Sequence, residues 1–274
     1  MLADTLRSVD LSRDALGDAL ATLDLPPRDI ASVLDRIGDQ TSGLLLYGSR
    51  ARGDFVPSSD FDLLRLTTDW NSPTFKTGLA SVSSYTPEQL RSASTTLFGT
   101  HLKRDGRILL ESERSLSAII EDLAPADPLE LLVRVRRYAT ILNQPISESR
   151  AHAAGLVRLA RYLLRTAVYA SAMKRGRTCF SVRELAALYG EPRLTTLLAS
   201  DPRLTSPPTY ELLEEITARL VAIVGPLPDH GFDSLESLAI GFWNSDRNLA
   251  TLAIRAADED GDSLDYSELP KVLL

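Results

Sequence analysis

The 274-residue sequence predicts an α+β N-terminal domain followed by an all-α C-terminal domain. Short apolar runs bounded by glycine or by turn residues occur before about residue 112, and such runs are typical of buried strands. From about residue 115 onward, the sequence reads almost wholly as helices interrupted by prolines. We predict one domain over residues 1–120 and a second over residues 121–274, with the boundary between residues 112 and 128.

The first forty residues predict two amphipathic helices that serve as packing elements. The segment Leu25-Pro26-Pro27 breaks the pattern and separates the two helices. The apolar residues near helical spacing are Leu6, Val9, Leu16 and Leu20.

Four strands are predicted in the rest of the N-terminal domain. The run Gly43–Tyr47 is short, apolar and closed by Gly48, which favours a buried strand over a helix. Thr86-Pro87 then predicts a helix start, with proline at the first helical position. The further predicted strands are Phe61–Leu66, Leu79–Tyr85 and Arg107–Leu110.

The composition limits the classes of protein that the chain can represent. No apolar run approaches the length that crosses a bilayer, and the N-terminus shows no secretory core, so we expect a soluble, cytoplasmic protein without membrane contact. Cys179 is the only cysteine, which excludes a disulfide framework or a cysteine-based zinc site within one chain.

The net charge of −7 is unevenly distributed along the sequence. Residues 131–193 contain 12 arginines and lysines against 3 glutamates, so their net charge is 12 − 3 = +9. Both ends of the chain are acidic. We expect a polyanion, either a nucleoside triphosphate or RNA, to be drawn to the middle segment.

Two aspartates follow a glycine-serine turn in the N-terminal domain. Asp60 and Asp62 are two residues apart in a strand-like segment, so their side chains project from one face. Paired carboxylates suit Mg²⁺, or Mn²⁺ in its place, and such metal ions clamp the attacking and leaving oxygens of an in-line displacement. Gly48-Ser49 lets backbone N–H groups and a hydroxyl approach phosphate closely.

The string from Gly48-Ser49 through Arg52-Gly53-Asp54 to Asp60-Phe61-Asp62 resembles the signature of the DNA polymerase beta-like nucleotidyltransferase superfamily, especially its minimal bacterial members. The resemblance covers about residues 42–112. It implies a mixed sheet flanked by helices, Mg²⁺, and transfer of a nucleoside monophosphate from a triphosphate. It also implies that Gly48 and Ser49 contact the triphosphate and that Asp60 and Asp62 hold metal and are catalytic.

Active members of that superfamily generally supply a third carboxylate from a later strand. The strand that should carry it here is Leu79–Tyr85, where the candidate positions are Ser81 and Ser83. A serine is not a general base unaided, because its own proton must first be removed. Asp105 and Glu111 are later acids that could substitute, although we expect surface roles for both. Three alternatives remain: another group activates the acceptor, the base lies elsewhere, or the domain is catalytically degenerate.

Three further residues of the N-terminal domain are candidates for the site. Arg50 and Arg52 either add positive charge near the phosphates or are ordinary surface arginines at a helix start, and we count Arg52 among the nucleotide-binding candidates. His101 is a lone histidine beside an apolar helix, a setting in which a structural role is commoner than a catalytic one.

A long helix is predicted between Arg150 and Arg177. Its arginines at spacings of three and four form one stripe, which either contacts an acceptor or phosphate or is a solvated face that balances the acidic parts. Tyr162 and Tyr169 lie beside the stripe, where tyrosine rings suit base stacking. The stripe consists of Arg158, Arg161 and Arg165.

These observations predict a Mg²⁺-dependent nucleotidyltransferase that moves AMP, or another NMP, from an NTP substrate such as ATP to a hydroxyl. RNA, such as a tRNA end, or a protein is the expected acceptor, and no reading of DNA sequence is expected. The alternative is a degenerate binding module that acts as a partner in a toxin-antitoxin or phage-defence pair. The missing third carboxylate favours the alternative, whereas the intact motif from Gly48 to Asp62 opposes it.

Overall fold

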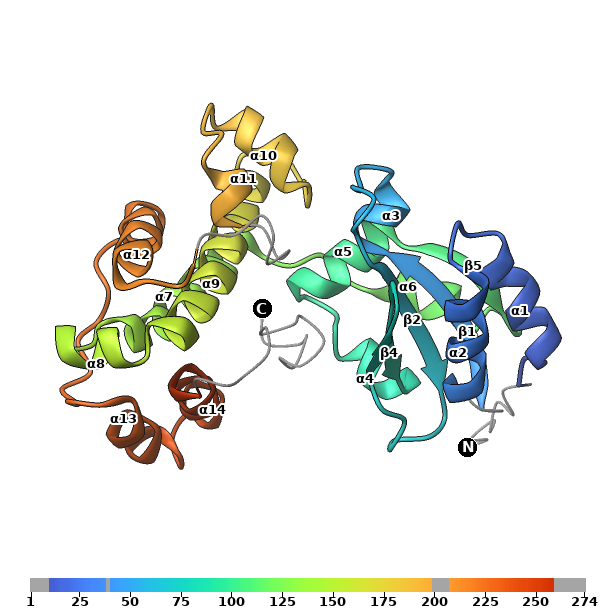
Figure 1. The fold of residues 1–274 in the computed structure, drawn as a ribbon, viewed down its shortest axis with the longest axis horizontal. Coiled ribbons are helices and arrows are strands. Elements are labelled where there is room, and N and C mark those ends of the chain that lie inside the picture. Colours follow the sequence, from blue (N-terminus) through green and yellow to red (C-terminus); the bar gives the residue numbers. More distant parts are fainter. Residues whose placement is uncertain (1–9, 38–39, 199–206, 259–274) are drawn as a thin grey trace. The chain divides into compact units, whose positions relative to one another are not determined.

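The computed structural model describes residues 10–37, 40–198 and 207–258. The chain divides into two compact units, Met1–Ala126 and Asp127–Leu274, each of which is described by itself (Figure 1). Leu6 and Val9 of the predicted first helix lie outside the described residues.

The N-terminal unit contains a mixed five-stranded sheet in the order β3-β4-β2-β1-β5. β2 and β4 are parallel, and the other three neighbouring pairs are antiparallel. The four predicted strands and the mixed sheet are confirmed, whereas β3 was not predicted. The strands are β1 (Thr41–Tyr47), β2 (Phe61–Thr67), β3 (Phe75–Thr77), β4 (Ala80–Tyr85) and β5 (Arg107–Glu111).

Helices cover both faces of this sheet (Figure 1). α1 and α2 pack on the face formed by Leu44, Leu46 and Leu63. The opposite face, with Leu45 and Leu64, packs against the helices that follow β4 in the chain. Because β1 is buried on both faces, its sequence is a continuous apolar run rather than an alternating one. The helices are α1 (Arg13–Ala21), α2 (Pro27–Ile37), α3 (Gly48–Arg52), α4 (Pro87–Arg91), α5 (Leu97–Asp105) and α6 (Ser117–Asp122).

The short hairpin of β3 and β4 is fixed to α2 by a buried carboxylate. Asp29 is only 5% exposed, and its Oδ2 accepts the backbone N–H of Leu79 at 3.0 Å. Gly78 adopts a φ of +55°, and a Cβ atom there would lie 2.2 Å from the Asp29 carboxylate oxygens. Glycine therefore allows the turn and the close approach of α2, and together they hold β3 in place.

Every regular secondary-structure element in the described part of the C-terminal unit is a helix, as predicted. α9 is its central helix, because α7, α12 and α14 all pack against it (Figure 1). The predicted helix between Arg150 and Arg177 is divided at His152, which ends one helix and precedes the next. The helices are α7 (Pro128–Ala139), the 3₁₀ turn η1 (Thr140–Leu142), α8 (Ile146–Ala151), α9 (Ala153–Lys174), α10 (Val182–Leu188), α11 (Leu194–Leu197), α12 (Tyr210–Val224), α13 (Leu235–Phe242) and α14 (Arg247–Ala257).

No helix in the described part of the chain combines the length and the apolar character that a membrane span requires.

Candidate active site

Four side chains form one row across the sheet, and the row contains the second aspartate of the motif. In the strand register, Tyr47 lies opposite Asp62, Asp62 lies opposite Ser81, and Ser81 lies opposite Lys76. Directly opposed residues of neighbouring strands present their side chains on the same face of a sheet. The row therefore brings a carboxylate, a hydroxyl and an ammonium to one face from β2, β4 and β3.

The turn after β1 lies directly against the Asp62 carboxylate. Gly48 has a φ of +74°, a left-handed conformation that favours glycine. A Cβ atom on Gly48 would lie 2.2 Å from Asp62 Oδ2, well inside van der Waals contact. The carbonyl of Ser49 accepts the N–H groups of Gly53 and Asp54 at 2.9 and 3.2 Å, which closes the following turn. The glycine-serine turn and one aspartate are thus brought together, as the motif implies.

The other aspartate of the motif, Asp60, forms an ion pair with a residue that the sequence analysis missed. Lys76 Nζ donates to Asp60 Oδ2 at 2.7 Å, and both side chains are partly exposed. Lys76 lies in β3, which has only three residues and therefore shows no strand periodicity. The segment Phe75-Lys76-Thr77-Gly78 before the next strand is a hairpin signal that would have revealed it.

Serines occupy the position where the resemblance implies a third carboxylate. Ser81 is directly opposite Asp62 in the parallel ladder of β2 and β4, and it is 6% exposed. Ser83 is fully buried, and its Oγ lies 3.5 Å from the hydroxyl of Tyr47. This side of Asp62 is therefore formed by neutral hydroxyl groups.

Glu111 is not a surface acid but a helix cap. Its Oε2 accepts the backbone N–H groups of Leu116 and Ser117 at 2.9 and 2.8 Å, at the start of α6. A carboxylate at a helix start satisfies N–H groups that have no partner within the helix. The surface role predicted for Glu111 was wrong, because β5 delivers this side chain directly to α6.

Arg50 organises the loop that leads to Asp60. Its guanidinium lies over the rings of Phe55 and Phe61, 4.1 and 4.2 Å from their centroids. Its Nε and Nη2 also donate to the carbonyl of Ser59, at 3.2 and 3.1 Å, and Nη2 donates to that of Pro57. These contacts hold the connection between α3 and β2. Arg50 therefore positions the backbone that leads to Asp60 and does not need to contact a ligand itself.

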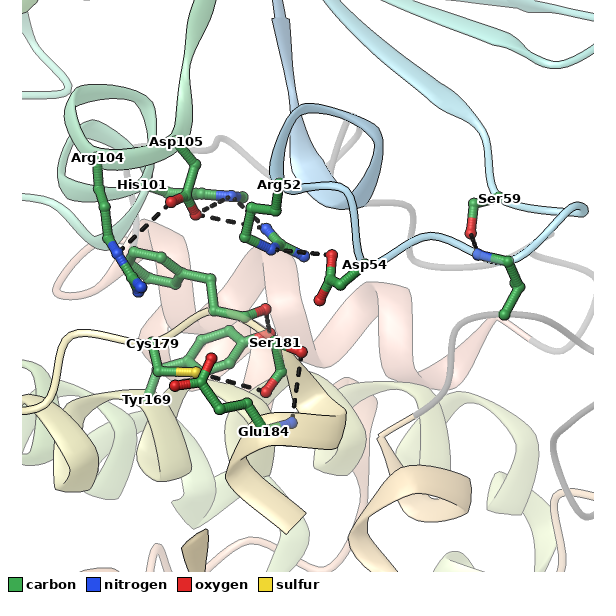
Figure 2. A network of polar contacts seen from close by, with 12 residues as sticks. Arg52, Asp54, Ser59, His101, Arg104, Asp105, Tyr169, Cys179, Ser181 and Glu184 are labelled. Atoms are coloured by element: carbon green, nitrogen blue, oxygen red, sulfur yellow. Dashed lines mark hydrogen bonds and ion pairs between the residues drawn. The ribbon is translucent and has the colours of Figure 1, made fainter. Parts of the chain in front are cut away.

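Arg52 lies in a polar cluster between α3 and α5 (Figure 2). Arg52 Nε donates to Asp54 Oδ1 at 3.2 Å, and Nη1 donates to His101 Nε2 at 2.9 Å. Nη1 is also 3.5 Å from Asp105 Oδ2, while Arg104 Nε is 3.5 Å from Asp105 Oδ1. The Arg52 side chain is only 16% exposed, so it is not an ordinary surface arginine.

Asp105 is buried within this cluster, with a side chain only 7% exposed. The surface role predicted for Asp105 was wrong, because α5 packs against α3 and turns its last residue inward. Burial is the largest influence on this carboxyl and raises its pKa, an effect that Arg104 and Arg52 oppose. His101 also packs edge-on against Tyr47, with 6.1 Å between ring centroids.

The raised pKa of Asp105 predicts a pH dependence of stability. The folded protein holds the Asp105 proton more tightly than the unfolded chain, so this contribution is present below the unfolded pKa and is lost as pH rises through the folded pKa. We expect the free energy of unfolding of wild type, relative to Asp105→Asn, to fall as pH rises from 4 to 7. Urea unfolding of both proteins at each pH measures the difference, and a constant difference would contradict the assignment.

The arginine stripe of the C-terminal unit has partners within that unit. Arg158 Nη2 donates to the carbonyl of Asp258 at 2.6 Å, and Arg165 donates to the carbonyl of Leu198. Burial, and secondarily the charge of Arg165, lowers the pKa of Arg161. All three side chains are half-buried.

Tyr162 and Tyr169 do not form the base-stacking surface that was one of the two alternatives for the stripe. Each is 7% exposed, and the Tyr169 hydroxyl donates to the carbonyl of Phe180 at 3.1 Å. That alternative was wrong because α9 is the central helix of its unit and is packed on several sides.

The candidate site offers two carboxylates for a metal ion. No group of three or more histidine, cysteine, aspartate or glutamate residues within the described ranges could hold a metal. The Lys76 ammonium shows that a cation fits against Asp60. Two carboxylates suit a divalent ion that takes its other ligands from water and phosphate, which is common for Mg²⁺.

The mixed sheet, its flanking helices and the contact between Gly48 and Asp62 agree with the architecture that the resemblance to nucleotidyltransferases implies. No family model and no curated protein matches the chain. One similar solved structure is a toxin-antitoxin with AMP-PNP, at 18% identity over 41% of this chain and 84% of that chain, with a TM-score of 0.25. A second is a nucleotidyltransferase-like protein from Exiguobacterium sibiricum 255-15, at 15% identity over 76% of this chain and 74% of that chain, with a TM-score of 0.30.

Proposed function

We propose that the chain is a nucleotidyltransferase that binds a nucleoside triphosphate and a divalent metal ion at the turn between β1 and α3. The observation that carries the proposal is the contact of the Asp62 carboxylate with Gly48, beside Asp60. A glycine with a left-handed φ at this point lets the backbone of the turn approach phosphate oxygens closely. The carboxylates would hold the metal ion, and Ser49 would contact the triphosphate.

In the proposed reaction, an acceptor hydroxyl oxygen attacks the α-phosphorus of the triphosphate. A bond forms between this oxygen and phosphorus, and the bond from phosphorus to the bridging oxygen of the β-phosphate breaks. Pyrophosphate leaves with the electron pair, and the acceptor proton passes to solvent water. The bound metal ion would stabilise negative charge on the phosphate oxygens. Because Ser81 is not a base, we attribute catalysis to positioning and charge neutralisation.

The donor and the acceptor are further parts of the proposal. AMP from ATP is the first nucleotide to test, and the acceptor is a hydroxyl on RNA, such as a tRNA end, or on a protein. The net positive charge of residues 131–193 supports a polyanionic acceptor. Within that segment, Arg137 and Arg193 already pair with acids of the C-terminal unit, at 2.7 and 2.9 Å. A cytoplasmic location and a bacterial source are parts of the proposal; the supply of nucleoside triphosphates in the cytoplasm supports the first, and the resemblance to minimal bacterial members supports the second.

The test incubates the purified protein with each α-³²P-labelled NTP, Mg²⁺ or Mn²⁺, and total bacterial RNA and protein. We expect label on one macromolecule with wild type and none with Asp60→Ala/Asp62→Ala. The matched control is Asp14→Ala/Asp18→Ala, which removes two exposed carboxylates from α1 and should keep full activity. Transfer that survives loss of Asp60 and Asp62 would refute the proposed site.

A second candidate is a catalytically degenerate binding module that serves as a partner in a toxin-antitoxin or phage-defence pair. Ser81 opposite Asp62 and the pairing of Asp60 with Lys76 favour it, because both features weaken a site built for metal chemistry. This candidate predicts nucleotide binding without transfer of label to any acceptor.

A further inference from the structure

Lys76 places a positive charge against Asp60, on the sheet face that also carries Asp62. Its Nζ is 2.7 Å from Asp60 Oδ2. In the row across the sheet, Ser81 of β4 lies between Lys76 of β3 and Asp62 of β2. The hairpin that carries Lys76 is anchored to α2 by Asp29, and by a 2.7 Å contact between the hydroxyls of Ser32 and Thr77. The ammonium is therefore presented by a braced strand.

The local charge differs from that of a site with three carboxylates. Ser81 provides no charge where the resemblance implies a third carboxylate, and the Lys76 ammonium offsets the carboxylate of Asp60. A divalent ion close to the ammonium would be repelled by it, and Asp60 would have to leave its present partner. Asp60 is paired with an ammonium, and Asp62 lies at the glycine turn where phosphate is proposed to bind.

We propose that Lys76 takes the place of a second divalent ion, so that this site binds one divalent ion, centred on Asp62, together with the triphosphate. The inference rests on the proposed function and deepens it. A lysine ammonium is a compact point charge with three donors, so it can bond to Asp60 and to a phosphate oxygen at the same time. Lys76 thereby supplies, from an anchored strand, the positive charge that a second ion would bring.

The number of metal ions can be measured without turnover. Equilibrium dialysis with Mn²⁺ and α,β-methylene-ATP, an analogue that resists cleavage next to the α-phosphate, gives the Mn²⁺ retained per nucleotide retained. We expect one Mn²⁺ per nucleotide for wild type and for Lys76→Arg. Lys76→Glu restores a third carboxylate to the site and is expected to retain two. Arg91→Glu, which makes the same change of charge at an exposed position of α4, should retain one.

Two Mn²⁺ per nucleotide in wild type, or one in Lys76→Glu, would overturn the inference about Lys76 while leaving the proposed function intact. If wild type retains no nucleotide, or if Asp60→Ala/Asp62→Ala retains as much nucleotide and Mn²⁺ as wild type, both proposals fail. Because the Lys76 side chain is 56% exposed, its variants are expected to fold, and circular dichroism verifies this.

Discussion

Gly48→Ala is expected to weaken metal-dependent nucleotide binding by about 100-fold; a misplacement of about 1 Å slows catalysis by a factor of that size, and we expect a displaced metal-binding carboxylate to have an effect of similar size on binding. The new Cβ atom would lie 2.2 Å from Asp62 Oδ2 and 3.1 Å from its Cγ, so the carboxylate must move. The φ of +74° adds a conformational cost of about 1–2 kcal/mol for a residue with a side chain. Titration of the protein with a fluorescent ATP analogue and Mg²⁺ measures the loss.

Gly53→Ala is the matched control for this prediction. Gly53 also has a left-handed φ, +80°, but no atom lies within 4 Å of its Cβ position. Gly53→Ala therefore has the conformational cost of a left-handed φ but no steric clash with a neighbouring atom. We expect it to lose about 1–2 kcal/mol of stability while binding nucleotide normally. Equal loss of binding in the two variants would show that backbone strain, and not the position of Asp62, controls the site.

Gly155→Ala is expected to destabilise the C-terminal unit by about 3 kcal/mol, the upper range for overpacking a well-packed core. Gly155 is buried in α9 where α14 crosses it. A Cβ atom there would lie 2.0 Å from the carbonyl oxygen of Ala256 and 2.7 Å from its carbonyl carbon. These are backbone atoms, so the two helices must separate. Urea unfolding, with hydrogen exchange in α9 and α14, measures the effect.

The same substitution in another helix should act in the opposite direction. Gly17 lies in α1, and its Cβ position is 3.5 Å from the nearest atom, which is ordinary contact with the flexible end of Leu34. Gly17→Ala is therefore expected to stabilise the protein by about 0.5–1 kcal/mol, since alanine loses less backbone freedom than glycine. A stable Gly155→Ala protein would mean that α14 does not pack on α9 as described.

The sequence predicted helices and strands correctly where the local hydrophobic pattern matched the burial of the element. β1 is a continuous apolar run because both of its faces are covered, and the break at Pro26-Pro27 separates α1 from α2. β3 was missed because three residues are too few for a periodic signal. Tyr162 and Tyr169 were misread because helical spacing places residues on a common stripe but does not say which sides of the helix are covered.

The sequence by itself determined the residues of the motif and the fold class, because glycine at a tight turn and aspartates in alternation are local requirements. Only the tertiary structure decided which other side chains contact the residues of the motif. Asp60 pairs with Lys76 sixteen residues later, and Arg52 meets Asp105 through the packing of α3 on α5. Such pairs depend on strand register and helix packing, and a shift of one residue in β3 would turn Lys76 to the other face of the sheet. Spacing along the chain does not specify that register.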